Sequence, residues 1–252
     1  LWEKVRRAGW GGRFTTTLPS GAHKGTYYTV ALDGSEYFRS TKLQCPHCLR
    51  QTDPQGRVHY SHKTVGATVV RAGSHQVLPL DVEEVRNPTV ESAPQDCELT
   101  AGKRLITRVR QEHPQMALIM IGDDLYSHVP FVEQLHALRQ HYVLVAKPAS
   151  HPTLMAAVAA AEDTAQSQTG QWTEGSGTRQ RTYTYRLVRQ VPLSLESTVR
   201  VTYVEVWEQS GSGQQLYHNS WITDLDVDAT NVAVVVQIGR TRWKIENEQF
   251  NV

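Results

Sequence analysis

The sequence predicts an α/β protein built on a mixed sheet, and three observations support this fold class. Runs rich in β-branched and aromatic residues predict early strands at Thr26 to Asp33, Tyr60 to Arg71 and His75 to Leu80. Apolar strands at Ala117 to Ile121 and Tyr142 to Ala146 then alternate with segments of helical spacing. Alternation of polar and apolar residues returns in the last third of the chain, which predicts further antiparallel strands.

The first predicted strand ends in a carboxylate. An apolar run stops at Asp33, and Gly34 follows, so we expect the acid to lie at the strand end with the backbone turning away at once. The next two strands are joined by the turn Ala72-Gly73-Ser74, which makes the start of the sheet antiparallel. A turn dipeptide at Asp33 is common on protein surfaces, and this plain interpretation stays open for the motif alone.

The middle of the chain repeats this pattern with helices between the strands. A helix carrying Leu105 and Val109 precedes the strand Ala117 to Ile121, which breaks at Gly122-Asp123-Asp124. Further helices are expected at Pro130 to Gln140 and at Thr153 to Glu162. An antiparallel start followed by alternating strands and helices is the arrangement of RNase H-like mixed sheets flanked by helices, although periodicity alone also allows other α/β folds.

The later segments predict an inserted antiparallel β subdomain. Residues 166–179 are polar and Gly-rich and are expected to form a linker, and strands follow at Arg181 to Leu193, Val199 to Glu208 and Tyr217 to Leu225. Asp228 suits the cap of a closing helix, whereas Val232 to Val236 would equally suit a strand. The predicted organisation is a core in 1–163, a β insertion in 164–225 and a closing helical segment of the core in 226–252.

Composition limits the class of protein. The 252 residues are 39% hydrophobic and 20% charged, with a formal net charge of +1, as in an ordinary globular protein. No run of about 18 apolar residues occurs, so we expect no membrane span. Three cysteines do not make a disulfide scaffold, and a reducing, cytoplasmic setting is the default expectation.

Cysteine and histidine gather in one stretch. Cys45 and Cys48 form a Cys-x2-Cys pair, and His59 and His62 follow, so the four side chains are candidate ligands of a structural zinc ion. The gap between the pairs and the His-x2-His spacing both differ from the zinc-finger pattern. The alternative, two reduced cysteines in a tight turn beside two strand histidines, stays open. Cys97 stands alone and is expected to pack in a core.

Three segments carry a resemblance to a known family. LDGSEYFRS, IGDDLYSH and GRTRWKIENEQF resemble the three acidic motifs of bacterial insertion-sequence transposases of the cut-and-paste DDE class. The subgroup in view has a Tyr-x2-Arg-x3-Glu-x6-Lys signature and a β insertion before the last acid. The ordered similarity runs from Val30 to Phe250.

By position, the resemblance makes Asp33, Asp123 and Glu246 the catalytic acids, which would hold two Mg2+ or Mn2+ ions. Arg242 matches the signature arginine and stands one helical turn before Glu246. Two positions depart from the family pattern, because Gly239 stands where the signature has tyrosine and the lysine position lies beyond residue 252. These departures concern binding of the DNA end more than binding of metal.

Other candidates lie beside the proposed acids. Asp124 and Glu248 fall out of register with the motifs and are expected to support the metal ligands. Candidate contacts to DNA phosphate are Lys147, Arg242 and Lys244. Trp221 resembles a tryptophan that stacks on a flipped base in hairpin-forming relatives; packing inside the β unit is the equally weighted alternative.

The resemblance implies a bacterial, nucleoid-associated DNA transposase that acts on double-stranded DNA with transposon terminal repeats, as a homodimer or larger assembly. It would cut and join DNA by two-metal-ion hydrolysis and strand transfer. Two alternatives are an RNase H-like nuclease without strand transfer and a catalytically silent DNA-binding or zinc-stabilised domain.

Overall fold

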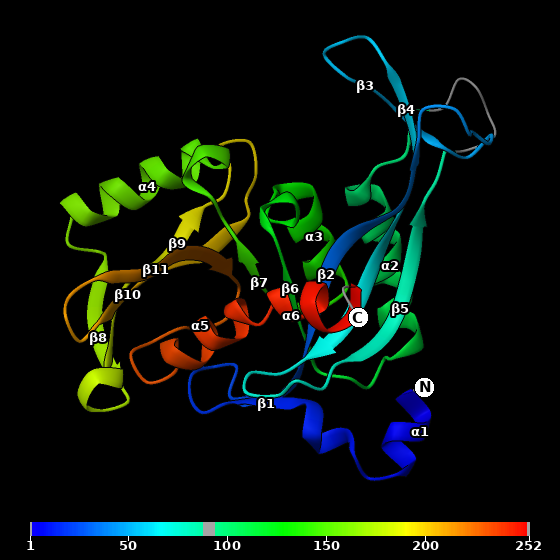
Figure 1. Cartoon of the computed structure of the whole chain (residues 1–252). Coiled ribbons are helices and arrows are strands. Elements are labelled where there is room, and N and C mark those ends of the chain that lie inside the picture. The colour runs from blue at the N-terminus through cyan, green and yellow to red at the C-terminus, as the bar shows by residue number, and fades with distance from the viewer. Residues whose placement is uncertain (1, 88–93, 251–252) are drawn as a thin grey trace.

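The structure, a computed structural model, describes residues 2–87 and 94–250 (Figure 1). Within these residues an 11-stranded mixed sheet carries helices on its faces, so the predicted α/β class with a mixed sheet is confirmed. The strands are β1 (Thr15–Leu18), β2 (Gly25–Ser40), β3 (Leu49–Thr52), β4 (Val58–Val70), β5 (Leu78–Val85), β6 (Leu118–Gly122), β7 (His141–Val145), β8 (Gln168–Glu174), β9 (Arg181–Pro192), β10 (Arg200–Ser210) and β11 (Gln215–Thr223). The α-helices are α1 (Trp2–Arg7), α2 (Glu98–Glu112), α3 (Val129–Ala137), α4 (Pro152–Asp163), α5 (Val232–Arg240) and α6 (Trp243–Ile245).

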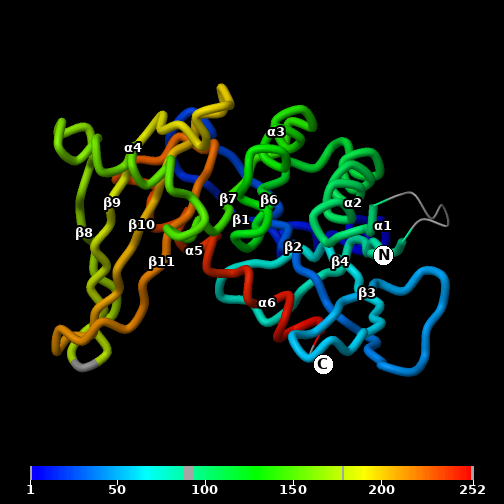
Figure 2. The backbone as a smooth tube through the Cα atoms, turned by 90° about the horizontal axis from the view of Figure 1, so that it is seen from above, coloured from blue at the N-terminus to red at the C-terminus, as the bar shows by residue number. Residues whose placement is uncertain are grey.

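The strand order explains why distant segments meet. The sheet runs β3-β4-β2-β6-β7-β11-β10-β9-β8, while β1 pairs with β2 and β5 pairs with β4. The β2–β6 and β6–β7 pairs are parallel and the other pairs are antiparallel. Residues 164–225, the predicted insertion, hold β8 to β11, and they continue the same sheet because β11 pairs with β7. Figure 2 shows these strands at one end of the molecule and β3 at the other.

The two faces of the sheet hold separate cores. Val30 and Leu32 point to a core that also contains Leu105 of α2 and Phe131 of α3. Ala31, between them, points to the opposite core with residues of β6, β11 and α5. Alternate side chains of one strand therefore anchor helices on both faces, and each fully buried aliphatic side chain stabilises the fold by about 1.5–3 kcal/mol.

The predicted end of the first strand is wrong. β2 continues through Asp33 and Gly34 to Ser40, with Asp33 opposite Gly66 and Gly34 opposite Val65 of β4. Gly34 is required for a different reason than a turn: a β-carbon there would overlap the Glu98 carboxyl of α2. Close approach of another element, rather than a change of direction, accounts for this glycine.

The predicted linker is also wrong, because it contains a strand. β8 lies within it and pairs with β9, with Trp172 opposite Tyr183 and their rings stacked at 4.8 Å. β8 is the last strand of the sheet and is mostly exposed, which explains its polar composition. In the closing segment the helical alternative holds: α5 begins at Val232, and Asp228 Oδ1 accepts the backbone N–H of Thr230.

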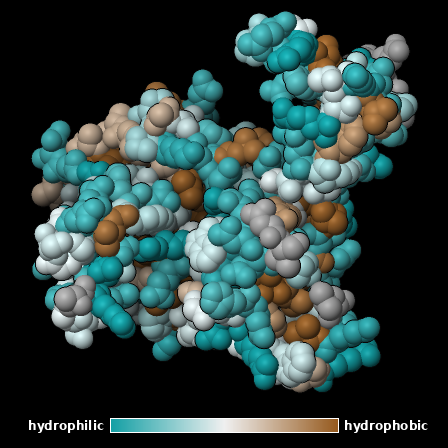
Figure 3. Space-filling model, in the orientation of Figure 1, coloured by the Kyte–Doolittle hydropathy of each residue, from teal (hydrophilic) through white to brown (hydrophobic). Residues whose placement is uncertain are grey.

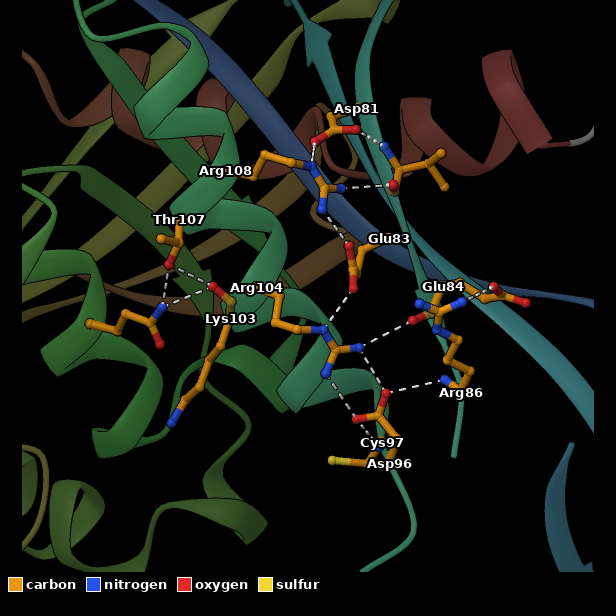
Figure 4. A network of polar contacts seen from close by, with 12 residues as sticks. Asp81, Glu83, Glu84, Arg86, Asp96, Cys97, Lys103, Arg104, Thr107 and Arg108 are labelled. Atoms are coloured by element: carbon orange, nitrogen blue, oxygen red, sulfur yellow. Dashed lines mark hydrogen bonds and ion pairs between the residues drawn. The ribbon is translucent and has the colours of Figure 1, made fainter. Parts of the chain in front are cut away.

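Ion pairs fix α2 against β5 (Figure 4). Arg108 contacts Asp81 and Glu83 at 2.5 Å each, and Arg104 contacts Glu83 at 2.6 Å and Asp96 at 2.7 Å. Burial would raise the pKa of Glu83, but the two guanidinium groups outweigh burial and hold that pKa below its ordinary value. This network holds the start of α2, and with it Glu98, beside β2.

The visible face is mainly hydrophilic, with small scattered hydrophobic patches (Figure 3). Cys97, which was expected in a core, is exposed at the N-terminus of α2, so that prediction is wrong. Among the helices in 2–87 and 94–250, none combines the length and apolar character needed to cross a membrane.

Candidate active site

Parallel pairing brings the first two predicted acids together. Ala31 of β2 lies opposite Ile121 of β6, so the same register, continued by two residues, sets Asp33 beside Asp123. Asp123 follows the end of β6 and caps the next turn, its Oδ1 accepting the Leu125 N–H over 3.0 Å. The two carboxylates therefore lie at neighbouring positions where β6 ends and β2 runs on.

The third acid arrives from the far end of the chain. α6 packs against β4 and leads into a π-helical turn, Glu246–Phe250. Thr68 donates a hydrogen bond to Gln249, and the Phe250 ring fills the space above Gly66, where a β-carbon would lie 3.2 Å from the ring. Because Gly66 pairs with Asp33, this docking brings Glu246 over the first acid.

Arg242 lies between two of the acids. Its Nη1 is 2.7 Å from Glu246 Oε1 and 3.5 Å from Asp33 Oδ2. The spacing of four residues had predicted that Arg242 and Glu246 share a helix face, and their side chains are bonded in the structure. The Arg242 guanidinium thus neutralises part of the negative charge of Asp33, Asp123 and Glu246.

The electrostatics of the site favour proton or cation binding. Burial raises the pKa of Asp33 to about 7, the Arg242 charge opposes this rise, and the nearby Glu246 and Asp123 charges add to it. Within the described residues, Asp33, Asp123 and Glu246 do not form a set whose ligand atoms all lie within 4.8 Å of one another. Asp33 is the acid on which the charges of both Glu246 and Asp123 act.

A fourth carboxylate, Glu98, was missed by the sequence reasoning. It lies over Gly34 in the first turn of α2, and its Oε1 accepts the Tyr126 hydroxyl over 3.0 Å. Burial raises its pKa, and the Asp123 charge raises it further. An acid at a helix start is too common to single out from sequence; only the strand order brings this one to the others.

The predicted DNA contacts have mixed outcomes. Lys147 is exposed after β7, and its backbone N–H donates to Asp124 Oδ1 over 2.6 Å. Lys244 is 5% exposed and its ammonium donates to the Ser74 carbonyl, so its predicted role at phosphate is not supported. Trp221 is 1% exposed and packs against Gly239, which favours the alternative of packing in the core over base stacking.

The two supporting acids have their own partners. Asp124 also accepts the Ser150 hydroxyl and lies 3.4 Å from His151 Nε2. Asp124, His128 and His151 form one compact set of possible metal ligands. Glu248 Oε1 contacts His75 Nδ1 at 3.2 Å. Asp124 therefore holds the loop after β7, and Glu248 ties the closing helix to the β4–β5 turn.

A pocket of about 390 Å3 adjoins the closing helix. It is lined by Trp172 from β8, Arg240 from α5 and Trp243 from α6, among others. Trp243 is 43% exposed, and its ring meets the Lys244 ammonium at 4.7 Å. An exposed aromatic ring thus lies one residue from Arg242, whereas sequence reasoning had assigned an aromatic role to Trp221 instead.

The cysteine and histidine candidates separate into two groups. Cys45, Cys48 and His62 lie together next to β3 and on β4, and these two strands project from the body (Figure 1). His59 faces away from them, with its Nε2 3.0 Å from Asp53 Oδ2. The predicted set of four ligands is therefore corrected to three, because residues three apart on a strand point to opposite faces.

In comparisons with known proteins, no family model matches the chain and no curated protein is similar to it at a significant level. Support for a function therefore comes from the three motifs and from the geometry described above.

Proposed function

We propose that the protein is a metal-dependent DNA transposase of the DDE class, which cuts and joins DNA at transposon ends. The observation that carries this proposal is the meeting of Asp33, Asp123 and Glu246 around Arg242, from three segments that lie far apart in the sequence. The alternative, in which Asp33 is only a surface turn residue, does not explain why acids from the end of β6 and from the closing helix lie beside it.

The topology supports an RNase H-like core. Five strands run β5-β4-β2-β6-β7, the first three antiparallel and the last two parallel to β2, with α2 and α3 as the crossovers. Strands β8 to β11 fall between this core and the closing helices, as the β insertion does in the family that the motifs resemble. The order of core strands, β insertion and closing helices along the chain, and the order of the three acids, are therefore those of the family that the motifs resemble.

The residues would divide the chemistry as follows. Divalent ions held by these acids would help to activate a water or 3'-hydroxyl and to stabilise the leaving oxygen. Asp33 would hold both ions, and Asp123 and Glu246 would each hold one, since carboxylates are the hard ligands that Mg2+ and Mn2+ prefer. Arg242 orients Glu246 and carries a donor pair suited to a DNA phosphate.

DNA would lie across the face that carries the acids. Arg242 and the exposed Lys147 flank the acids, and Trp243 offers an exposed ring for base stacking. The pocket beside Trp243 is also lined by Arg240, whose cation lies 4.3 Å from the Tyr217 ring centroid. Double-stranded DNA is thus the proposed partner, bound by a dimer or larger assembly on paired ends.

A cleavage and joining assay tests the proposal. The labelled substrate is the DNA that flanks the coding sequence of the chain, incubated with Mn2+ and a target plasmid. We expect cut ends that become covalently joined to the plasmid, and loss of both steps by at least a hundredfold in Asp33→Asn and Glu246→Gln. Asp163→Asn, at the exposed end of α4, is the matched control.

Other outcomes decide between the alternatives. Cutting that depends on the acids without joining would identify a nuclease instead. Full retention of activity in Glu246→Gln, or no activity in the wild-type chain with any divalent ion, would contradict the catalytic assignment and favour a silent DNA-binding domain.

A further inference from the structure

Cys45, Cys48 and His62 present three ligand atoms at metal-binding separations. Cys45 Sγ and Cys48 Sγ lie 3.3 and 3.4 Å from His62 Nε2, and the two sulfur atoms are 3.6 Å apart. Tetrahedral zinc with bonds of about 2.0–2.3 Å places such atoms about 3.5–3.8 Å from one another. Three atoms in this triangle can therefore all reach one ion after small adjustments.

Local structure holds the two cysteines in this arrangement. Cys48 N–H donates to the Cys45 carbonyl over 3.2 Å, which closes a tight turn, and Cys45 N–H donates to Cys48 Sγ over 3.1 Å. Asn87 fixes the turn from the end of β5, its Nδ2 donating to the Cys48 carbonyl over 2.8 Å. A backbone N–H aimed at sulfur stabilises a thiolate, the form that binds metal.

The histidine is supported on its other side. A β-bulge between Glu36 and Phe38 of β2 faces His62, and the ring of Tyr37 stacks on the imidazole at 5.8 Å. His62 Nδ1 is buried without a hydrogen-bond partner and lies 3.8 Å from Glu84 Oε1. That carboxylate accepts the Tyr37 hydroxyl over 3.0 Å. Carboxylates beside the second nitrogen of a ligating histidine fix its tautomer and raise its basicity.

We propose that Cys45, Cys48 and His62 bind one zinc ion, with Glu84 as the carboxylate behind the histidine. The fourth position holds water, because the site opens to a pocket of about 500 Å3 and His47 is turned to the Asn87 carbonyl at 3.1 Å. The ion links the connection between β2 and β3 to β4, and so makes the part of the molecule formed by β3 and the start of β4 more rigid. This inference is independent of the proposed function, since the acids lie elsewhere.

Zinc content of the purified full chain tests the site. We expect one zinc per chain, which falls at least tenfold in Cys48→Ser and in His62→Gln. His59→Gln and Cys97→Ser are the matched controls, and both should keep full zinc. A wild-type chain without zinc after expression in zinc-supplied medium, or equal loss in His59→Gln and His62→Gln, would overturn the proposal.

Cobalt binding by the wild-type chain gives a second measurement, which does not depend on whether a variant folds. Co2+ added to the reduced, zinc-free chain should produce a sulfur-to-cobalt charge-transfer band that zinc abolishes. Glu84→Gln should keep the band but weaken affinity roughly 10- to 100-fold. Absence of the band, or thiol titration that finds Cys45 and Cys48 joined as a disulfide, would contradict the metal site.

Discussion

Arg242 Nη1 donates to Glu246 Oε1 over 2.7 Å, and the same nitrogen lies 3.5 Å from Asp33 Oδ2. A cation therefore stands where two of the acids that we assign to metal binding converge. In the absence of divalent ions the guanidinium offsets their repulsion; with ions present it competes with them for the same carboxylates.

Arg242→Gln should separate these two effects. At pH 8.5 the variant is expected to bind Mn2+ about tenfold more tightly, equivalent to about 1.4 kcal/mol, because one competing charge is gone. DNA cleavage should nevertheless fall by at least tenfold, since Glu246 loses its orienting partner. Mn2+ calorimetry and the cleavage assay measure the two quantities. Arg200→Gln removes an exposed charge on β10 and should change neither; weaker Mn2+ binding by Arg242→Gln would count against this placement.

Metal affinity should depend on pH through Asp33. Its pKa in the folded chain is about 7, above the ordinary value of 3.8, so below pH 7 a proton occupies the carboxylate that should hold both ions. We expect Mn2+ affinity to rise about tenfold per pH unit up to about 7 and to level off above it. Calorimetric titrations between pH 5.5 and 8.5 measure this slope. A flat profile would mean that Asp33 is not a ligand.

The stability of the metal-free chain should fall as pH rises, whereas its Mn2+ affinity should increase. Because the folded pKa of Asp33 is raised, the folded state binds more protons than the unfolded state between about pH 4 and pH 7. This group therefore lowers stability as pH rises through that window, and the loss is complete above about pH 7. Thermal melts with and without Mn2+ should diverge as pH increases, and identical melts at pH 8 would contradict the expectation.

Glu98→Gln tests the acid that the strand order adds to the site. The amide keeps the shape and the Tyr126 contact but removes a buried negative charge, so the metal-free chain should be stabilised by about 0.5–2 kcal/mol at pH 8. Mn2+ binding should weaken by at least threefold. Urea denaturation and Mn2+ titration give both values. Glu112→Gln, at the other end of α2, is the control and should show neither change.

Gly239→Ala should destabilise a helix that ordinary propensity would strengthen. A β-carbon at Gly239 would lie 2.5 Å from Trp221 Nε1, so overpacking of about 1–3 kcal/mol should exceed the gain of about 1 kcal/mol for Ala over Gly. Gly12→Ala, with no atom within 4 Å, should be near neutral. In a double-mutant cycle, Trp221→Phe should relieve part of the loss; additive effects would show that the two residues are not in contact.

Much of the fold follows from patterns that the sequence carries locally. The apolar runs of β6 and β7 and the helical spacing of α2 give elements close to those observed, because burial on both faces leaves few alternatives. β3 and β8 were missed, since edge strands can be polar when pairing supplies their hydrogen bonds. The continuation of β2 past Asp33 was missed because Asp-Gly is typical of a turn.

The site was predictable only where a motif fixes the residue. Arg242 and Glu246 share a helical face, so their contact follows from spacing of four residues. The placements of Lys244 and Trp221 depend on which face of the closing helices and of β11 is covered, and the sequence does not specify those contacts. His59 and His62 point to opposite faces because both lie on β4, whereas the strand predicted from Tyr60 left His59 outside it.

Mn2+ binding to the wild-type chain and its acid variants tests the central claim most directly. Calorimetry at pH 8 should give two Mn2+ ions per chain for the wild type and for Asp163→Asn. Asp33→Asn should lose both ions, while Asp123→Asn and Glu246→Gln should each weaken one by at least tenfold. Equal Mn2+ binding by the wild type and Asp33→Asn would contradict the assignment of these acids as a shared metal site.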